Sequence, residues 1–308
     1  MKEIKDYKPI IIAQDQGNGN HKTVHTCITT GVEPLSGEAI ASTNVLVMDG
    51  KSYVIGEKHL TYRDDKTSDN SFYIMGLSSI AEEMMHMGFY EANVILAEGL
   101  PLNFLKAQGK AYKEYLMQNP DPEFEYKGHT FKLHISNVLV FPQGLSAMAL
   151  MGEIKGDIVL VDIGNGTMDL ALFQDGKPIE SSLVTEEYGV AQCVNNVKKA
   201  VSKTLGRTVD ERRIESIIKA GCAENDEDKI ALITKKVTEE YANEILRRVR
   251  AYGYDDSYMK LYIIGGGGCI LKNFSNISEN GNVIINEDIH INAKGYEKFA
   301  KQMLNMGA

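Results

Sequence analysis

The sequence predicts an α/β fold built from two related domains, and three observations lead to this prediction. Short apolar segments alternate along the chain with longer segments of helical periodicity, a pattern typical of the α/β class. One phrase, Asp-x-Gly-Asn-Gly, occurs at residues 15–19 and again at 162–166, each time after a short apolar run. The length of 308 residues is ordinary for two domains.

In the first half of the chain, the two stretches beside the first phrase are expected to pair as strands around it. Asp49-Gly50 between β-formers predicts a second hairpin, and Lys127-Gly128 a third. Strands are predicted at residues 10–13, 23–29, 45–48, 52–55, 93–97, 124–126, 130–133 and 137–141. Helices are predicted at residues 73–89, 105–117 and 145–151.

The second half repeats the plan, with a boundary between the domains expected near residues 152–157. Its strands are predicted at residues 158–161, 170–173 and 261–264. Its helices are predicted at residues 189–204, 209–220, 228–252 and 294–303. We therefore expect domains at residues 1–152 and 153–291, and a closing helix within 292–308 that returns to the first domain.

The composition excludes several classes of protein. A net charge of −9, from 33 basic and 42 acidic residues, argues against a protein that coats nucleic acid broadly. The four cysteines are scattered without a Cys-x-x-Cys pair, which disfavours a disulfide framework or a zinc site and fits a reducing cytoplasm. The polar N-terminus does not read as a signal peptide, and no apolar run has membrane-spanning length, so no membrane contact is expected.

The first phrase has the chemistry of a phosphate-binding turn. Gly17 and Gly19 permit a tight loop whose backbone N–H groups face outward, and Asn18 tolerates left-handed conformations. Asp15 supplies a carboxylate for a hydrated metal ion, and Lys22 is close enough in sequence to meet a phosphate. An ordinary hairpin turn with a surface lysine is the competing interpretation.

The second phrase has the same form and continues as Gly164-Asn165-Gly166-Thr167. Asp162 ends a strand that is apolar on both faces, where a lone buried carboxylate is unfavourable. Contact with metal-bound water, or activation of a water molecule, would satisfy it. A plain turn again competes, but less well once the phrase has occurred twice.

Two further segments are candidates. Gly265 to Gly268 follow an apolar strand, and four residues without side chains allow a flat ring to lie on the backbone. Gln143, between a strand end and a helix, could orient a water molecule without acting as a base. A flexible turn and a helix-start residue are the alternatives.

Taken in order, these segments resemble the superfamily of actin, sugar kinases and heat-shock chaperones, and within it the ParM-type bacterial actins that segregate plasmids. Residues 15–22 and 162–169 are similar to its two phosphate hairpins, and 263–271 to its adenosine segment. Residues 141–149 and 292–296 resemble its two connecting segments. The resemblance implies a two-lobed ATPase fold of duplicated ribonuclease H-like domains, with the nucleotide in the cleft between them.

The resemblance also implies roles for particular residues. Asp15 and Asp162 would hold Mg²⁺ through water, and Asp162 and Gln143 would act on the attacking water. The phosphates would be bound by the two turns and a lysine: Gly17, Asn18, Gly19, Asn20, Lys22, Gly164, Asn165, Gly166 and Thr167. Gly265, Gly266 and Gly267 would hold the adenosine, or the guanosine of GTP, since glycines do not distinguish the rings.

The function implied is that of a cytoplasmic ATPase whose triphosphate form assembles into filaments and whose diphosphate form falls apart. A DNA-binding adaptor protein would link the filament to plasmid DNA. Two alternatives stay open from the sequence: a small-molecule kinase of the same superfamily, and a cytoskeletal scaffold without a role in segregation.

Overall fold

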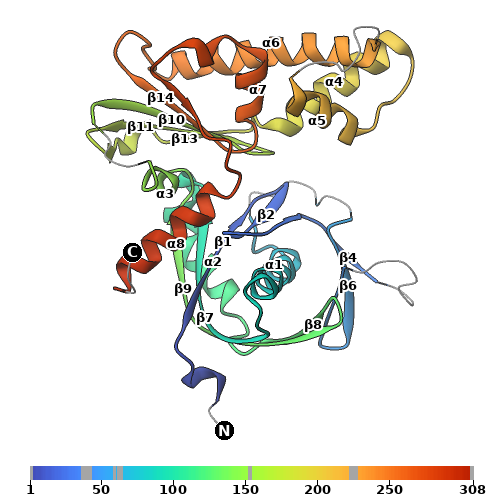
Figure 1. Cartoon of the computed structure of the whole chain (residues 1–308), viewed down its shortest axis with the longest axis vertical. Helices are drawn as coiled ribbons and strands as arrows, with labels where there is room; N and C mark the ends of the chain where they lie inside the picture. The colour runs from blue at the N-terminus through green and yellow to red at the C-terminus, as the bar shows by residue number, and fades with distance from the viewer. Residues whose placement is uncertain are drawn as a thin grey trace. The chain divides into compact units, whose positions relative to one another are not determined.

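A computed structural model describes residues 3–35, 44–57, 60, 65–151, 155–221 and 228–305. The chain divides into two compact units, and each is described by itself. The first unit comprises Met1–Gly152 and His290–Ala308, and the second comprises Glu153–Ile289. Strands and helices alternate in both (Figure 1), which confirms the α/β class.

The first unit contains a nine-stranded sheet in the order β3-β2-β1-β7-β9-β8-β5-β6-β4. Its strands are β1 (Ile10–Gln16), β2 (Asn20–Lys22), β3 (Cys27–Thr29), β4 (Val32–Pro34), β5 (Val45–Met48), β6 (Lys51–Ile55), β7 (Glu91–Leu100), β8 (Glu123–Tyr126) and β9 (His129–Pro142). Its helices are α1 (Ser71–Met87), α2 (Leu102–Leu116), α3 (Leu145–Met148), α8 (Ile291–Met303) and the short η1 (Ile4–Asp6).

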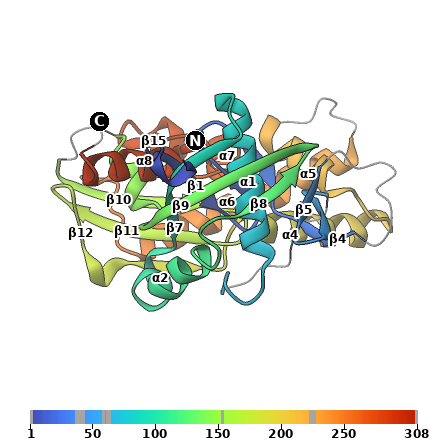
Figure 2. The ribbon, with the colours of Figure 1, turned by 90° about the horizontal axis from the view of Figure 1, so that it is seen from below.

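The sheet of the first unit curves around α1, so this helix is buried on nearly every side (Figure 1). In the view of Figure 2, β8 and β9 cross in front of it. Consecutive apolar and small residues, such as Ile74, Met75 and Leu77, all contribute to one core with the strands. β7 lies between β1 and β9, parallel to both, and nine of its ten residues are buried, as expected of a strand covered on both faces.

Helix α8 comes from the end of the chain and packs on β1 and β7 in the first unit. Two glycines permit this contact. A Cβ on Gly99 would lie 2.0 Å from the Tyr296 hydroxyl, and a Cβ on Gly295 would lie 2.3 Å from the Ser146 carbonyl oxygen. The Asn292 side chain then accepts a hydrogen bond of 3.0 Å from the Gly144 N–H. Helix α8 therefore fixes the backbone beside Gln143.

The second unit contains a smaller sheet in the order β12-β11-β10-β14-β15, with β13 also paired to β11. Its strands are β10 (Asp157–Ile163), β11 (Met168–Gln174), β12 (Lys177–Pro178), β13 (Val184–Glu186), β14 (Lys260–Ile264) and β15 (Val283–Ile285). Its helices are α4 (Val190–Leu205), α5 (Glu211–Ala220), α6 (Lys229–Ala251), α7 (Gly268–Phe274) and the short η2 (Glu180–Ser182) and η3 (Ile277–Glu279). One apolar core joins the sheet to α4, α5, α6 and α7.

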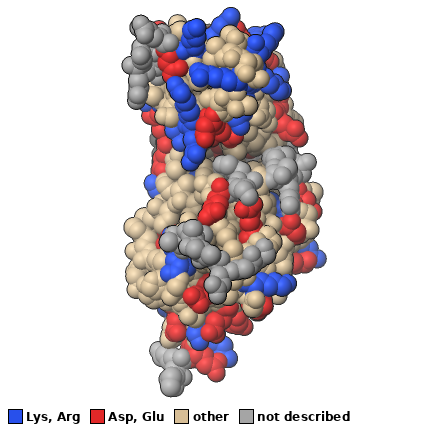
Figure 3. Space-filling model, turned by 90° about the vertical axis from the view of Figure 1, so that its right-hand side faces the viewer, with Lys and Arg blue, Asp and Glu red and all other residues tan. Residues whose placement is uncertain are grey.

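Basic side chains gather on the face of the second unit that carries α4 and α5 (Figure 3). Helix α4 contributes Lys198, Lys199 and Lys203 and contains no acidic residue, while α5 contributes Arg212 and Arg213. The net charge of the chain therefore does not describe every face, and the absence of broad DNA binding stays a prediction.

Several predicted elements were wrong in extent. The strand expected at residues 23–29 is broken by a turn, in which the Thr23 N–H donates to the Thr26 carbonyl. The strands expected at 130–133 and 137–141 are one strand, β9, which accommodates an irregularity in its pairing with β7. The helix expected at 145–151 ends at Met148, because the chain continues with hydrogen bonds between residues three apart, as in a 3₁₀-helix. Strand β15 and helix α7 were not predicted.

The other predicted helices are confirmed to within a few residues. Within the described ranges, no helix combines the length and apolar character needed to cross a membrane. The expected domain boundary falls partly on residues 152–154, which lie outside the described residues.

Candidate functional site

The first candidate half-site is the turn between β1 and β2. Asp15 is opposite Lys22 in this hairpin, and their side chains form an ion pair of 2.6 Å between Lys22 Nζ and Asp15 Oδ2. Gln143, directly after β9, donates a hydrogen bond of 2.7 Å from Nε2 to Asp15 Oδ1. The structure thus brings together three predicted residues, one of them distant in sequence.

The environment of Asp15 keeps its carboxylate charged. Burial alone would raise the pKa of Asp15, which is 2% exposed. The charge and hydrogen bond of Lys22, the charge of Lys66 and the hydrogen bond from Gln143 outweigh this effect, so the pKa lies below its ordinary value. A negative carboxylate held in this way is a suitable acceptor for metal-bound water.

The backbone of the first turn is tightly closed. The Gly17 N–H donates to the Asn20 carbonyl at 3.1 Å, and a Cβ on Gly17 would lie 2.8 Å from that same oxygen. The carbonyls of Gly17 and Gly19 accept from Thr30. No described residue accepts a hydrogen bond from the N–H groups of Asn18 and Gly19, so both donors are available to an anion.

The second candidate half-site is the turn between β10 and β11, where Asp162 is opposite Asp169. The Gly164 N–H closes the turn on the Thr167 carbonyl at 2.8 Å. The first residues of α4 then form hydrogen bonds with the backbone of the turn. The Val190 and Ala191 N–H groups donate to the carbonyls of Gly164 and Asn165, at 3.1 and 2.9 Å.

Two residues that support the second turn were not predicted from the sequence. Gly189 is required because a Cβ there would lie 2.4 Å from the Asn165 carbonyl oxygen. Gln192 donates to the Gly166 carbonyl at 3.0 Å and accepts from the Gly189 N–H at 2.9 Å. The pattern Gly189-x-x-Gln192 at a helix start has the spacing of a capping box, a signal that could have drawn attention to them.

The glycine run meets the second turn within the same unit. Gly265 has φ of +86°, and a Cβ on it would lie 2.5 Å from Asp162 Oδ1. The Gly267 N–H donates to the Ile163 carbonyl at 2.9 Å, and a Cβ on Gly267 would lie 2.2 Å from Ile163 Cγ2. A Cβ on Gly266 would meet no described atom within 4 Å. Close packing thus requires glycine at residues 265 and 267, while the space beside Gly266 is open.

The run is not the flexible turn that four glycines suggest. Gly267 is the N-cap of α7 and Gly268 its first residue, so the second pair belongs to a helix start. Asp162 is 7% exposed, and Asp169 accepts a hydrogen bond from the Thr185 hydroxyl, which braces the strand pair behind the turn. The structure brings together Asp162, Gly164 to Thr167 and Gly265 to Gly267 in the second unit.

Lys66 is a residue of the first half-site that the sequence analysis missed. It is 6% exposed, and its Nζ donates to the Gln16 carbonyl at 2.6 Å. The same ammonium lies over the rings of Phe72 and Tyr112, 5.7 and 5.9 Å from their centroids. Lys66 stands in a polar stretch without periodicity, so nothing in the sequence distinguishes it.

The residues present fit a magnesium nucleotide better than a metal held by protein alone. In the part of the chain that the structure describes, no three His, Cys, Asp or Glu side chains cluster as metal ligands. Mg²⁺ usually keeps several waters and is bound by one or two carboxylates together with phosphate oxygens. Asp15 and Asp162, each beside a glycine turn, are donors of that kind.

Comparison with known proteins relates both halves of the chain to actin-like families. Residues 13–145 match the family described as actin like proteins, N terminal domain. Residues 160–276 match the family described as archaeal actin homologue MreB-like, C-terminal. No curated protein matches the chain significantly in sequence.

Solved structures share the fold over nearly the whole chain. The archaeal actin homolog Ta0583 superposes with a TM-score of 0.78 and 19% identity, over 96% of this chain and 99% of its own. A second structure of Ta0583, in complex with ADP, has a TM-score of 0.74 and 20% identity, over 95% and 99%. A 15-stranded ParM filament from Clostridium botulinum has a TM-score of 0.70 and 20% identity, over 96% and 100%. Each half of the chain thus matches an actin-like family, and the fold is that of the actin-like structures throughout.

Proposed function

We propose that the protein binds and hydrolyses a magnesium nucleoside triphosphate, ATP or GTP, and that both glycine turns act on the same nucleotide. Asp15 and Asp162 hold Mg²⁺ through its waters. The N–H groups at Asn18, Gly19, Asn165 and Gly166, with Asn20, Thr167 and Lys22, bind phosphate oxygens. Gly265 to Gly267 support the nucleoside.

The observation that carries this proposal is the group formed by Asp15, Lys22 and Gln143. A buried carboxylate, an ammonium and an amide lie within hydrogen-bond distance beside a turn with free N–H donors. When Mg²⁺ and triphosphate are bound, the metal neutralises charge on the phosphates. Gln143 orients water, since an amide positions a nucleophile but does not take its proton.

We further propose that the triphosphate form assembles into filaments, that hydrolysis destabilises them, and that filament growth separates plasmid copies attached through a DNA-binding adaptor. The fold match to a ParM filament and to the Alp12 filament supports self-assembly as the use of the nucleotide. A two-state response to the γ-phosphate is a common switch in nucleotide-binding proteins.

The experiment follows right-angle light scattering and phosphate release in one sample of full-length protein with Mg²⁺ and ATP, GTP or ADP. We expect scattering to rise with a triphosphate, to stay flat with ADP, and to decline as phosphate accumulates. Electron microscopy of the same sample should show filaments. Turnover that needs an added small-molecule acceptor, without scattering at any nucleotide, would identify a kinase instead.

The Asp162→Ala variant tests the assignment of the second turn. Phosphate release should fall at least about a hundredfold, because the carboxylate proposed to hold Mg²⁺ and act on the attacking water is removed. Asp256→Ala is the matched control, since this acid is exposed in the same unit. Turnover that persists in Asp162→Ala would contradict the assignment.

The role in segregation is tested in cells. If the gene is carried on a plasmid, its deletion should raise the frequency of plasmid loss per generation, and Asp162→Ala should do the same. Unchanged inheritance in both strains, with filaments present, would indicate a scaffold.

A further inference from the structure

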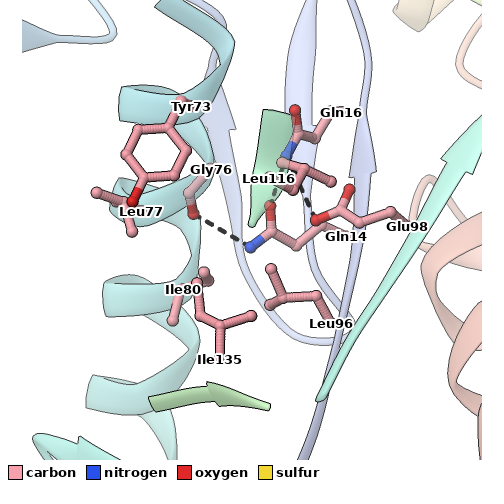
Figure 4. Close-up of a pocket in the computed structure, with 10 residues that line it drawn as sticks. All are labelled: Gln14, Gln16, Tyr73, Gly76, Leu77, Ile80, Leu96, Glu98, Leu116 and Ile135. Carbon is pink, nitrogen blue, oxygen red and sulfur yellow. Dashed lines mark hydrogen bonds between the residues drawn. The ribbon is translucent and has the colours of Figure 1, made fainter. Parts of the chain in front are cut away.

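The face of β1 opposite the candidate site carries a buried polar group. Side chains alternate along a strand, so Gln14 and Gln16 point to the other side of the sheet from Asp15. They point toward α1, and both are fully buried. Glu98 of β7 is opposite Gln14 in the parallel pairing and is also fully buried (Figure 4).

These side chains form a chain of hydrogen bonds with a fixed direction (Figure 4). Gln14 Nε2 donates to the Gly76 carbonyl of α1 at 3.1 Å. Gln16 Nε2 donates to Gln14 Oε1 at 3.1 Å and lies 3.4 Å from Glu98 Oε1. A carbonyl oxygen only accepts, so Gly76 sets the orientation of Gln14, which in turn sets that of Gln16. Glu98 ends the chain.

The close approach of β1 to α1 depends on this arrangement of amides. A Cβ on Gly76 would lie 2.9 Å from Gln16 Nε2, so the helix fits only where a glycine faces the two amides. A small cavity lies beside them, lined by Gln14, Gln16 and Glu98 among apolar residues. The volume that the centre of a water molecule could occupy in it is about 10 Å³. This is the size of a site for one water with polar partners.

The groups around Glu98 favour its neutral form. Burial raises the pKa of Glu98 well above its ordinary value, although the charge of Lys66 and the hydrogen bonds from Gln16 and Tyr112 oppose the rise. The nearby charge of Asp15 raises it further. The Tyr112 hydroxyl lies 3.4 Å from Glu98 Oε2, and Lys66 donates to the Gln16 carbonyl.

We propose that Glu98 is a positioning residue: it accepts the hydrogen bond at the end of the Gln14–Gln16 amide chain and so fixes Asp15, the residue between the two glutamines. The inference rests on the proposed nucleotide site, because Asp15 is where the positioning takes effect. Asp15 is held on its own side by Lys22 and Gln143, and on the other side by its neighbours' amides. A shift of β1 at either glutamine would move the carboxylate away from the metal-bound water.

The first test compares the thermal stability of the wild type and Glu98→Gln at pH 5 and pH 8. Glutamine has the shape of the neutral acid but does not titrate. The pKa of Glu98 is raised in the folded state. Its contribution to the stability of the fold is therefore complete below the ordinary pKa, and it declines as the pH rises toward the folded-state pKa. Within that window the folding constant of the wild type should fall about tenfold per pH unit relative to Glu98→Gln.

The variant should therefore match the wild type at pH 5 and melt at a higher temperature at pH 8. Glu125→Gln is the control, since Glu125 is exposed on β8 of the same unit, and should show no such dependence. A Glu98→Gln variant that is less stable than the wild type at pH 8 would contradict a neutral Glu98, because Glu98 would then be an ionised partner of Lys66.

The second test compares kcat and KM for nucleotide turnover in Glu98→Gln and Glu98→Leu. Glutamine should keep kcat within about twofold, while leucine, which ends the amide chain, should lower kcat about tenfold with little change in KM. Equal kcat in both variants, or equal loss in both, would contradict a positioning role. If the wild type shows no turnover, the proposed function fails, and the stability test still decides whether Glu98 is neutral.

Discussion

Lys22 Nζ lies 2.6 Å from Asp15 Oδ2, directly across the β1–β2 hairpin, so the cation of the first turn is bound to its carboxylate. The lysine side chain is 20% exposed and that of the aspartate 3%. The pair thus places a positive charge at the edge of the site while the negative charge is held inside. A phosphate that approaches the turn meets the ammonium first.

Replacing Lys22 with methionine should weaken triphosphate binding at least about tenfold and adenosine binding much less, because only the phosphates meet the ammonium. Stability should fall by about 2 kcal/mol, less than for a fully buried pair, since Lys66 and Gln143 still face Asp15. Isothermal calorimetry and chemical unfolding measure the two effects. The exposed Lys51→Met serves as control, and equal losses for ATP and adenosine would argue against a phosphate role.

Gly265 and Gly266 offer a matched pair of substitutions. Gly265→Ala places a Cβ 2.5 Å from Asp162 Oδ1 at φ of +86°, so it should destabilise the second unit by about 2 kcal/mol or more. Gly266→Ala meets no described atom within 4 Å and should leave the melting temperature unchanged. If the glycine run supports a nucleoside, Gly266→Ala should nevertheless weaken nucleotide binding. Unchanged affinity in this variant would exclude the run from the site.

Gly295→Ala should separate α8 from the segment that carries Gln143. A Cβ there would lie 2.3 Å from the Ser146 carbonyl, a backbone atom that cannot move alone. The expected loss of stability is about 1–3 kcal/mol. Gly109→Ala is the control, because its Cβ would make only an ordinary contact of 3.6 Å within α2 and should stabilise the helix slightly. A neutral Gly295→Ala would contradict the close packing of α8.

His21 predicts an acid-sensitive step. Burial lowers the pKa of His21 to about 3, assisted by the charges of Lys66 and Lys22 and opposed by that of Asp15. Below the ordinary pKa near 6.5, His21 is therefore protonated in the unfolded state but stays neutral in the folded state. The stability of the fold consequently falls as the pH drops below that value. Within the described residues neither ring nitrogen has a hydrogen-bond partner.

The His21→Leu variant should lose less stability than the wild type between pH 6.5 and pH 4, as measured by chemical unfolding. His129→Gln is the control, because His129 is exposed. Parallel curves for the wild type and His21→Leu would show that His21 is protonated in the folded protein.

The sequence was most informative where one local pattern sufficed. The period of residues 73–89 predicted α1, and Asp49-Gly50 predicted the β5–β6 hairpin, because turn chemistry and helical periodicity are local properties. The duplicated phrase predicted both turns. The ion pair between Asp15 and Lys22 was not predicted, because the second strand was expected to begin at residue 23 and instead begins at Asn20.

What the sequence left out depends on contacts between distant segments. Lys66 reaches the Gln16 carbonyl only because the segment before α1 folds over β1, and no spacing encodes that approach. The amide chain from Gly76 to Glu98 likewise joins a helix and two strands. Helix α7 was missed because it is short and its N-cap and first residue are glycines, which disfavour helices on propensity alone.

The stoichiometry of nucleotide binding, measured by calorimetry with Mg²⁺ and a non-hydrolysable ATP analogue, decides whether both glycine turns act on one nucleotide. We expect one nucleotide per chain, bound more weakly when either half-site is altered, by Lys22→Met in the first unit or Gly266→Ala in the second. Two nucleotides per chain, or an affinity that responds to only one of the two variants, would contradict it.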